Sequence, residues 1–239
     1  MRKSDVMQTV VGNDSAHNTN TDTCHVVEQN ELDSIQQQYA SKLKHFSANE
    51  IIYREDDSIS RVHIIRHGIV KLLSYLPNGR ARIIRLHNRN DWLGLEGLIN
   101  LPYKHTAIAV GDVEVNYVPL DKLRQLEYSR PRQYNQLLKH VCEHLVQADK
   151  WIADFSTGGI KPRVARLLLY LSDIEYGESS NMIDLLTVHE LADMLGVTQE
   201  SVSRILADLK RKDTLHKTAD SNDVTYEIDQ QGLHYVAGR

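Results

Sequence analysis

Four polar side chains near the C-terminal end of the chain have the types and spacing needed to read DNA bases: Gln199, Glu200, Ser203 and Arg204. On a helix they share the outward, N-terminal face when Val202, Ile205 and Leu209 are turned inward. Arginine can donate two hydrogen bonds to guanine, glutamate can accept one from the cytosine amino group, and serine can contact a base or a phosphate. The segment is therefore a candidate reading helix.

The preceding residues have the pattern of a first helix and a tight turn. Thr187 and Glu190 form a capping box that starts a helix, and Ala192 is small enough to let a second helix approach. Gly196 supplies the turn, and Thr198 can cap the second helix. This spacing predicts a DNA-binding helix-turn-helix. An ordinary amphipathic helical hairpin is the alternative interpretation.

Composition and charge bound the class of protein. The 239 residues are 41% hydrophobic and 25% charged, which is typical of a soluble globular chain and allows two domains. The net charge of −4 opposes nucleic-acid binding, but basic residues gather on and after the reading helix. The predicted DNA-binding residues are Thr198, Gln199, Glu200, Ser201, Ser203, Arg204, Lys210 and Lys217, with Arg211 and Lys212 adding local positive charge.

Two further observations concern compartment and redox chemistry. No apolar run approaches the roughly 20 residues that a membrane span needs, and the N-terminus lacks a signal-peptide pattern, so a cytoplasmic protein without membrane contact is expected. Cys24 and Cys142 are too few for a disulfide framework or an iron–sulfur cluster. We expect both to be free thiols.

The N-terminal half changes from polar to β-rich. Residues 1–30 lack apolar periodicity and are predicted to be a disordered arm, and residues 31–43 are predicted to form a short helix with Leu32, Ile35, Tyr39 and Leu43 on one side. Strands are predicted over 51–53, 62–65, 69–75, 82–86, 106–110 and 113–118, with a hairpin at Pro77-Asn78-Gly79. Many short strands predict a β-barrel or roll over residues 31–130.

A long helix is predicted next, over residues 131–157. Apolar residues recur there at alternating spacings of four and three: Tyr134, Leu138, Val141, Leu145, Ala148, Ile152 and Phe155. This heptad pattern favours a parallel homodimer, although packing against the protein's own barrel could produce the same stripe. Two copies of the reading helix would then meet a two-fold symmetric site.

The remaining residues, 158–239, are predicted to form the DNA-binding domain. Lys161-Pro162 opens a helix with Val164, Leu167, Leu168 and Leu171 on its apolar face. Residues 215–218 and 224–228 flank a turn-rich segment, which predicts a hairpin that forms a wing. The predicted fold class is α+β.

This order of elements resembles the CRP/FNR family of bacterial transcription regulators. The similarity rests on IIYREDDSISRVHIIRHGIVKL, YLPNGRARIIRL, DWLGLEGL, KPRVARLLLYL and the helix-turn-helix. It implies a cyclic-nucleotide-binding-like β-roll, a dimerisation helix and a winged helix-turn-helix, with double-stranded DNA and RNA polymerase as partners. Asp56 and Asn90 stand where the family usually has glycine, and both residue types tolerate the left-handed region.

The resemblance also locates an effector pocket, at Gly94, Leu95, Glu96, Gly97, His105 and Thr106. Members that bind cyclic AMP have Gly-Glu-Leu-Gly followed by Arg-Ser-Ala, in which glutamate holds the ribose and arginine the phosphate. Here the glutamate is shifted by one residue, and His105 replaces the arginine. Histidine has neither the permanent charge of arginine nor its bidentate guanidinium group. Cyclic AMP is therefore not the expected signal, and Cys24 alone does not make the cysteine cluster of the oxygen-sensing branch.

In the reading helix, Glu200, Ser203 and Arg204 are similar to the oxygen-sensing FNR branch. This similarity implies a half-site close to TTGAT, with Arg204 on guanine, Glu200 on the paired cytosine and Ser203 selecting the neighbouring thymine.

Metal, haem and enzyme activity are not expected. His140 and His144 stand four residues apart on the long helix, a spacing that can hold a metal, but solvated histidines on either side of Val141 explain the pair without any ligand. His63, His67, His87 or His105 could ligate haem, yet their spacing singles none out. No phosphate-binding glycine loop, paired-cysteine zinc motif or nucleophile elbow is present.

The sequence thus predicts a homodimeric DNA-binding regulator whose β-roll senses an unidentified signal. The alternatives are a small-molecule sensor that acts mainly through protein contacts and a DNA-binding regulator that needs no effector. Whether the protein activates or represses depends on where its site lies relative to RNA polymerase.

Overall fold

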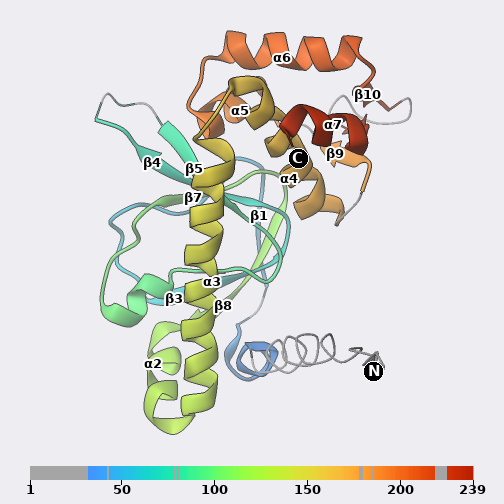
Figure 1. The fold of residues 1–239 in the computed structure, drawn as a ribbon. Helices are drawn as coiled ribbons and strands as arrows, with labels where there is room; N and C mark the ends of the chain where they lie inside the picture. Colours follow the sequence, from blue (N-terminus) through green and yellow to red (C-terminus); the bar gives the residue numbers. More distant parts are fainter. Residues whose placement is uncertain are drawn as a thin grey trace, which may run out of the picture.

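The computed structural model describes residues 32–41, 43–77, 79, 81–177, 180–184, 186–218 and 225–238. The predicted arm, residues 1–30, lies outside them. Figure 1 shows a β-rich body, a long helix that runs along it, and a smaller C-terminal domain at one end of that helix. This is the predicted α+β order of elements. None of the helices in the described ranges is long and apolar enough to cross a membrane.

Two four-stranded antiparallel sheets form the β-roll. One has the order β1 (Lys44–Phe46), β8 (Val113–Pro119), β3 (Arg61–His67) and β6 (Trp92–Leu93). The other has the order β2 (Ile51–Tyr53), β7 (Thr106–Ala109), β4 (Val70–Tyr75) and β5 (Ala81–His87). Alternate side chains point inward. They form a core that includes Phe46, Ile65, Val70, Leu72, Ala107, Val113 and Val115.

The predicted strands agree with the observed ones to within a few residues, but β1 and β6 were not predicted. The β4–β5 hairpin is present, with Tyr75 opposite Ala81, while Asn78 of its turn lies outside the described residues. Asp56 and Asn90 have φ angles of 66° and 73°, so both occupy the left-handed region as predicted. Their tolerance of that region keeps the turns without glycine.

Helices cover the outer face of the β1-β8-β3-β6 sheet. A short 3₁₀ helix (Leu95–Ile99) follows β6, and α2 (Leu120–Ser129) and α3 (Pro131–Phe155) follow β8. Proline lacks an N–H and is tolerated at a helix start, so Pro131 can begin α3 soon after α2 ends. The described part of the predicted N-terminal helix covers residues 32–39, so the helix ends before Leu43, which is 42% exposed.

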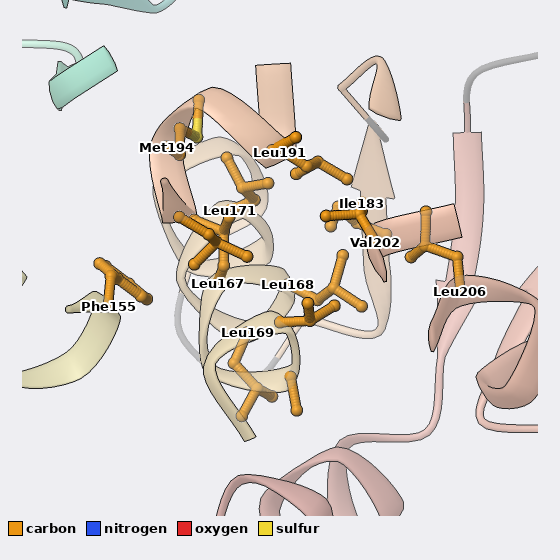
Figure 2. Close-up of a cluster of buried hydrophobic side chains, with 14 of the residues drawn as sticks. Phe155, Leu167, Leu168, Leu169, Leu171, Ile183, Leu191, Met194, Val202 and Leu206 are labelled. Carbon is orange, nitrogen blue, oxygen red and sulfur yellow. The ribbon is translucent and has the colours of Figure 1, made fainter. Parts of the chain in front are cut away.

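The C-terminal domain is built around α4 (Ile160–Tyr176). Around it lie β9 (Met182–Asp184), α5 (Val188–Leu195), α6 (Gln199–Arg211), β10 (Leu215–Lys217), β11 (Thr225–Ile228) and α7 (Gln230–Ala237). The three strands pair in the order β10-β11-β9, which gives the predicted hairpin one additional strand. Figure 2 shows Leu167, Leu168 and Leu171 of α4 among side chains from α5, α6 and β9. The predicted apolar face of α4 is confirmed.

The two halves of the molecule share part of one core. Leu73, Ile83 and Leu86 of β4 and β5 belong to the same buried cluster as Phe155 of α3 and the leucines of α4. The C-terminal domain is therefore docked against the roll in this conformation.

Candidate nucleic-acid interface

The capping and turn residues place α5 and α6 as predicted. The hydroxyl of Thr187 accepts from the backbone N–H of Glu190, and the Glu190 carboxylate accepts from the backbone N–H of Thr187 at 3.1 Å. Gly196 ends α5 with a φ of 62°, and its N–H donates to the carbonyl of Ala192. Thr198 caps α6 by accepting from the backbone N–H of Ser201. In Figure 1, α6 lies at the end of the molecule opposite α2.

The side chains that α6 buries differ slightly from the prediction. Val202 and Leu209 are fully buried, Ile205 is half-buried and packs against the same core, and Leu206, which was not predicted to face inward, is also buried. The difference arises because α6 packs on α4 as well as on α5, which turns the buried stripe toward Leu206. The predicted inward face is confirmed, and Leu206 is a buried residue that the prediction left out.

The outward face of α6 presents the four predicted base-reading side chains. Gln199, Glu200, Ser203 and Arg204 are all exposed. Hydrogen bonds from its own backbone N–H and from the Thr198 hydroxyl hold the pKa of Glu200 below its ordinary value, so its carboxylate is a hydrogen-bond acceptor at neutral pH. The arrangement suits a surface that approaches the edges of base pairs.

Some of the predicted DNA-contact residues already interact with neighbouring side chains of the protein. The Ser201 hydroxyl lies 3.0 Å from that of Thr198, within the cap itself. The amide of Gln199 lies 2.8 Å from Nδ1 of His189 on α5, a contact that the sequence did not suggest. These contacts orient the start of α6 without covering Glu200, Ser203 or Arg204.

The wing contacts α6 through a lysine. Lys210 Nζ donates to the Tyr226 hydroxyl of β11 at 3.0 Å and lies 4.5 Å from the centre of its ring. Lys217 is exposed on β10, next to the segment 219–224, which lies outside the described residues. Lys210 therefore connects the reading helix with the strand pair beside it.

Asp208, an acidic residue on α6 that was not among the predicted site residues, reduces the positive charge around it. Asp208 accepts from Lys161 at 2.7 Å and from Arg211 at 2.5 Å, and Lys212 lies 3.4 Å away. The hydrogen bond from Lys161 is the main reason that the pKa of Asp208 falls to about 2. Arg211 and Lys212 were expected to add free positive charge, but a neighbouring carboxylate partly balances it.

Buried polar contacts fix the position of α5 and α6 on the rest of the chain. Arg163 of α4 donates to the carbonyls of Phe155 and Leu195, which joins α3, α4 and the end of α5. Lys71 of β4, which is 7% exposed, lies 2.6 Å from Glu190. A cleft of about 920 Å³ opens beside this ion pair between the roll and the C-terminal domain.

Comparison with known protein families gives two matches, one over the β-roll and one over the C-terminal domain. A model described as "Cyclic nucleotide-binding domain" matches residues 43–127, and a model described as "Crp-like helix-turn-helix domain" matches residues 162–229. The chain belongs to the CRP/FNR family of transcription regulators. Its helix-turn-helix domain is a DNA-binding domain, and regulators of this family are typically dimers.

Relatives of this CRP/FNR regulator match along most of its length. The transcriptional regulator LdrP of Thermus thermophilus is 26% identical over 198 residues, which cover 82% of this chain and 97% of LdrP. The transcriptional activator protein FnrA of Stutzerimonas stutzeri is 26% identical over 192 residues, 79% of this chain and 78% of FnrA. The structure of FixK2 from Bradyrhizobium japonicum shares the fold, with a TM-score of 0.71, 24% identity and coverage of 82% and 96%.

The residues predicted to line the effector pocket of this CRP/FNR regulator lie around the 3₁₀ helix and at the start of β7. Gly94 and Gly97 have a packing explanation, because a Cβ would lie 2.9 Å from the Tyr103 ring at Gly94 and 2.8 Å from Ile59 at Gly97. Thr106 is buried, and its hydroxyl accepts from the backbone N–H of Glu55 at 3.1 Å. Leu95 is buried, and Glu96 and His105 are half-buried.

The predicted dimer seam divides into two sets along α3. Leu138, Leu145 and Ile152 are exposed, by 43%, 61% and 57%. Tyr134, Val141 and Ala148 are half-buried, and the first two pack against the core under α2. Phe155 is 3% exposed and lies inside its own chain beside Trp151 and Tyr170. Cys142, on the same helix, is a free and exposed thiol.

The histidines differ most from the prediction. His140 and His144 were expected to be solvated, but their side chains are only 12% and 13% exposed, because α3 packs this face against the roll. His63 is buried, and burial is the main reason that its pKa falls to about 3. His67 is exposed at the end of β3, and His87 is buried at the end of β5. The sequence separated His87 from His144, and the fold places their rings 5.1 Å apart.

Proposed function

We propose that the protein binds, as a homodimer, a two-fold symmetric promoter site built from TTGAT half-sites. The observation that carries this proposal is the exposed face of α6, where Glu200, Ser203 and Arg204 lie together at one end of the molecule. Arg204 donates to guanine, Glu200 accepts from the paired cytosine, and Ser203 selects the neighbouring thymine. Thr198, Gln199, Ser201, Lys210 and Lys217 supply the supporting contacts to bases and phosphates.

The dimer places two reading helices on one face of the DNA. Leu138, Leu145 and Ile152 recur at a heptad spacing on the exposed side of α3, which supports pairing with the same helix of a second copy. The two half-sites then lie about one DNA turn, roughly 34 Å, apart. We assign residues 31–130 to the sensor roll, 131–157 to dimerisation and 158–239 to DNA binding, and we expect RNA polymerase to be a further partner.

Cyclic AMP does not suit the predicted effector residues. Burial is the main reason that the pKa of His105 lies below its ordinary value, so the side chain is neutral at pH 7 and offers no charge to a cyclic phosphate. Glu96 lies on the 3₁₀ helix, one position away from the family's glutamate. We infer that the roll responds to a different signal.

Fluorescence anisotropy tests the DNA assignment directly. The full-length protein is titrated, at one salt concentration, against a TTGAT palindrome, a TGTGA palindrome and scrambled DNA. Tight binding to the first alone is the expected result. Equal affinity for all three duplexes, in the presence and absence of cell extract, would contradict the proposal.

Sedimentation velocity tests the dimer. Leu145→Glu should convert the dimer to a monomer, because it places charge in an apolar interface. Ile99→Glu is the matched control, since Ile99 is 69% exposed on the roll and away from α3. A Leu145→Glu protein that remains dimeric would exclude this seam.

A further inference from the structure

A cluster of three potential metal ligands lies where α3 crosses the roll. His87 ends β5, Asp91 lies in the turn between β5 and β6, and His144 lies in the middle of α3. One side-chain ligand atom from each of the three lies within 4.8 Å of the other two. All three side chains are largely buried, with exposures of 2%, 15% and 13%. None of its three members is among the predicted DNA-binding or effector residues.

The separations suit one small ion. Nδ1 of His87 lies 2.9 Å from Oδ2 of Asp91, and Nε2 of His144 lies 3.6 Å from Oδ1 of the same carboxylate. Ligands of a tetrahedral ion with bonds of about 2.1 Å are roughly 3.4 Å apart. The observed separations bracket that value, so small side-chain shifts would bring the three ligand atoms into coordination.

Two nitrogens in the cluster have no hydrogen-bond partner within the described part of the chain. They are Nε2 of His144 and Nε2 of His140, which lies one helical turn earlier. The two rings are 4.5 Å apart, and the exposed side chain of Glu143 lies 3.5 Å from the other ring nitrogen of His140. Burying a polar nitrogen without a partner is unfavourable. A ligand between these side chains would satisfy both nitrogens.

The protonation states also match those of metal ligands. Burial is the main reason that the pKa values of His87 and His140 lie below their ordinary value, which keeps both rings neutral at pH 7. Burial alone would raise the pKa of Asp91, but the His144 ring 3.6 Å away and the hydrogen-bonded His87 ring more than offset it and hold that pKa low. His87 and His140 therefore offer neutral imidazoles, and Asp91 offers an ionised carboxylate.

A second layer of contacts orients the carboxylate. The backbone N–H of Asn88 donates to Oδ2 of Asp91 at 3.1 Å, and its side-chain amide donates to the carbonyl of Ile174 on α4 at 3.2 Å. Such outer contacts are typical of carboxylates that bind metals. Through Asn88 the cluster touches the DNA-binding domain as well as the roll and α3.

We propose that His87, Asp91 and His144 bind one divalent first-row transition metal ion, with His140 or water as the fourth ligand. Two or three imidazoles and one carboxylate select ions such as Zn²⁺, Co²⁺ or Fe²⁺ over the hard ions Mg²⁺ and Ca²⁺, which prefer oxygen. The bound ion fixes α3 against the β5–β6 turn. The competing interpretation is a closed histidine–carboxylate network that needs no ion.

The full-length protein, stripped with a chelator and dialysed, is titrated with Zn²⁺ by calorimetry, and with Co²⁺ by visible absorption. We expect one ion per protomer, Co²⁺ bands of four-coordinate geometry, and no binding of Mg²⁺. Zn²⁺ should also raise the melting temperature, because it binds only the folded state. Binding no tighter than that of Mg²⁺ would overturn the proposal.

Two ligand variants and one control test the assignment. Asp91→Asn and His144→Gln keep side-chain size and should weaken Zn²⁺ binding more than about 100-fold, since even second-layer contacts change metal affinity by roughly 10- to 100-fold. His45→Gln removes an exposed histidine that also lies beside a carboxylate, 3.2 Å from Glu114, and should leave binding unchanged. Circular dichroism confirms that each variant is folded.

Equal Zn²⁺ affinity in folded Asp91→Asn, His144→Gln and parent protein would overturn the site. Loss of affinity in His45→Gln alone would do the same. No DNA is present in these titrations, so their outcome is independent of the proposed half-site.

Discussion

The outward face of α6 and the cluster of His87, Asp91 and His144 both gather polar side chains, but the first is exposed and the second is largely buried. On α6, solvent satisfies Glu200, Ser203 and Arg204 until another molecule replaces it. In the cluster, His87 and Asn88 supply the hydrogen bonds of Asp91, whose side chain is only 15% exposed. The difference separates two kinds of residue: substitution on α6 should change binding with little effect on folding, and substitution in the cluster should change folding itself.

The largest expected effect on this comparison comes from Asp91→Ala. The substitution leaves the buried ring of His87 and the backbone N–H of Asn88 without their acceptor. We expect the free energy of unfolding to fall by about 3 kcal/mol, because each buried donor left without an acceptor costs about 1–3 kcal/mol. Urea denaturation in the presence of a chelator measures this loss apart from any metal effect.

Asp121→Ala is the matched control for this measurement. Asp121 is 87% exposed and lies 4.0 Å from Arg124, so its removal should change stability by less than about 0.5 kcal/mol. Equal losses in the two variants would remove the distinction between the cluster and an ordinary surface carboxylate.

Arg204→Ala should give the opposite result. We expect the preference for TTGAT over scrambled DNA to fall by about 1–3 kcal/mol, or roughly 5- to 150-fold, because a bidentate contact to guanine is lost. The melting temperature should stay unchanged, since Arg204 is exposed. Anisotropy and thermal melting of the same samples test both halves of this statement. Retained specificity would show that other residues read the site.

A smaller effect is expected in the pH dependence of stability. Burial is the main reason that the pKa of Glu175 rises to about 7, and the nearby charge of Asp184 adds to it. The folded protein therefore binds this proton more tightly than the unfolded chain, whose glutamate has an ordinary pKa near 4.5. Stability from this group is fully present below pH 4.5 and is lost as the pH rises through 7.

Glu175→Gln should flatten this decline, because the amide does not ionise and can still accept from the backbone N–H of Asp184. The difference from the parent protein should be of the order of 1–2 kcal/mol between pH 4.5 and 7.5. Glu127→Gln, at an exposed position on α2, is the control. Parallel stability profiles for Glu175→Gln and the parent protein would contradict the prediction.

The smallest effect concerns Asp208. Asp208→Asn should release Lys161, Arg211 and Lys212 from their shared carboxylate, which leaves more positive charge beside the DNA. Affinity for scrambled DNA should rise several-fold at low salt, and the salt dependence should steepen by about one unit of slope per added phosphate contact. A slope equal to that of the parent protein would show that these cations do not meet the backbone.

The helix-turn-helix could be predicted from sequence because its rules are local. Thr187 and Glu190 cap α5, and Gly196 allows the turn, all within a few residues of one another. The alternating strands of the roll were predicted for the same reason. The β1 and β6 strands were not, since three and two residues carry no periodic pattern and depend on their partner strands.

The histidine cluster could not be predicted because it depends on packing between distant segments. The spacing of His140 and His144 was visible, but nothing near them in sequence indicates that α3 turns this face toward the β5–β6 turn. His87 and Asp91 stand four residues apart, and this spacing is the signal in the sequence that could have suggested a second pair of ligands beside His140 and His144. The role of Asp208 could not be predicted because Lys161, which donates to it, stands 47 residues earlier in the sequence and reaches it only through the packing of α4 on α6.

Glu190 imposes an evolutionary constraint on the docking of the two halves. In many surface ion pairs the acidic and the basic residue can exchange positions during evolution, but Lys71 and Glu190 cannot exchange without a further loss. A lysine at position 190 could restore attraction to a glutamate at position 71, yet it could not accept from the backbone N–H of Thr187. The same Glu190 carboxylate therefore serves both the ion pair between the roll and the C-terminal domain and the cap of α5. A single substitution of Glu190 should remove both interactions at once.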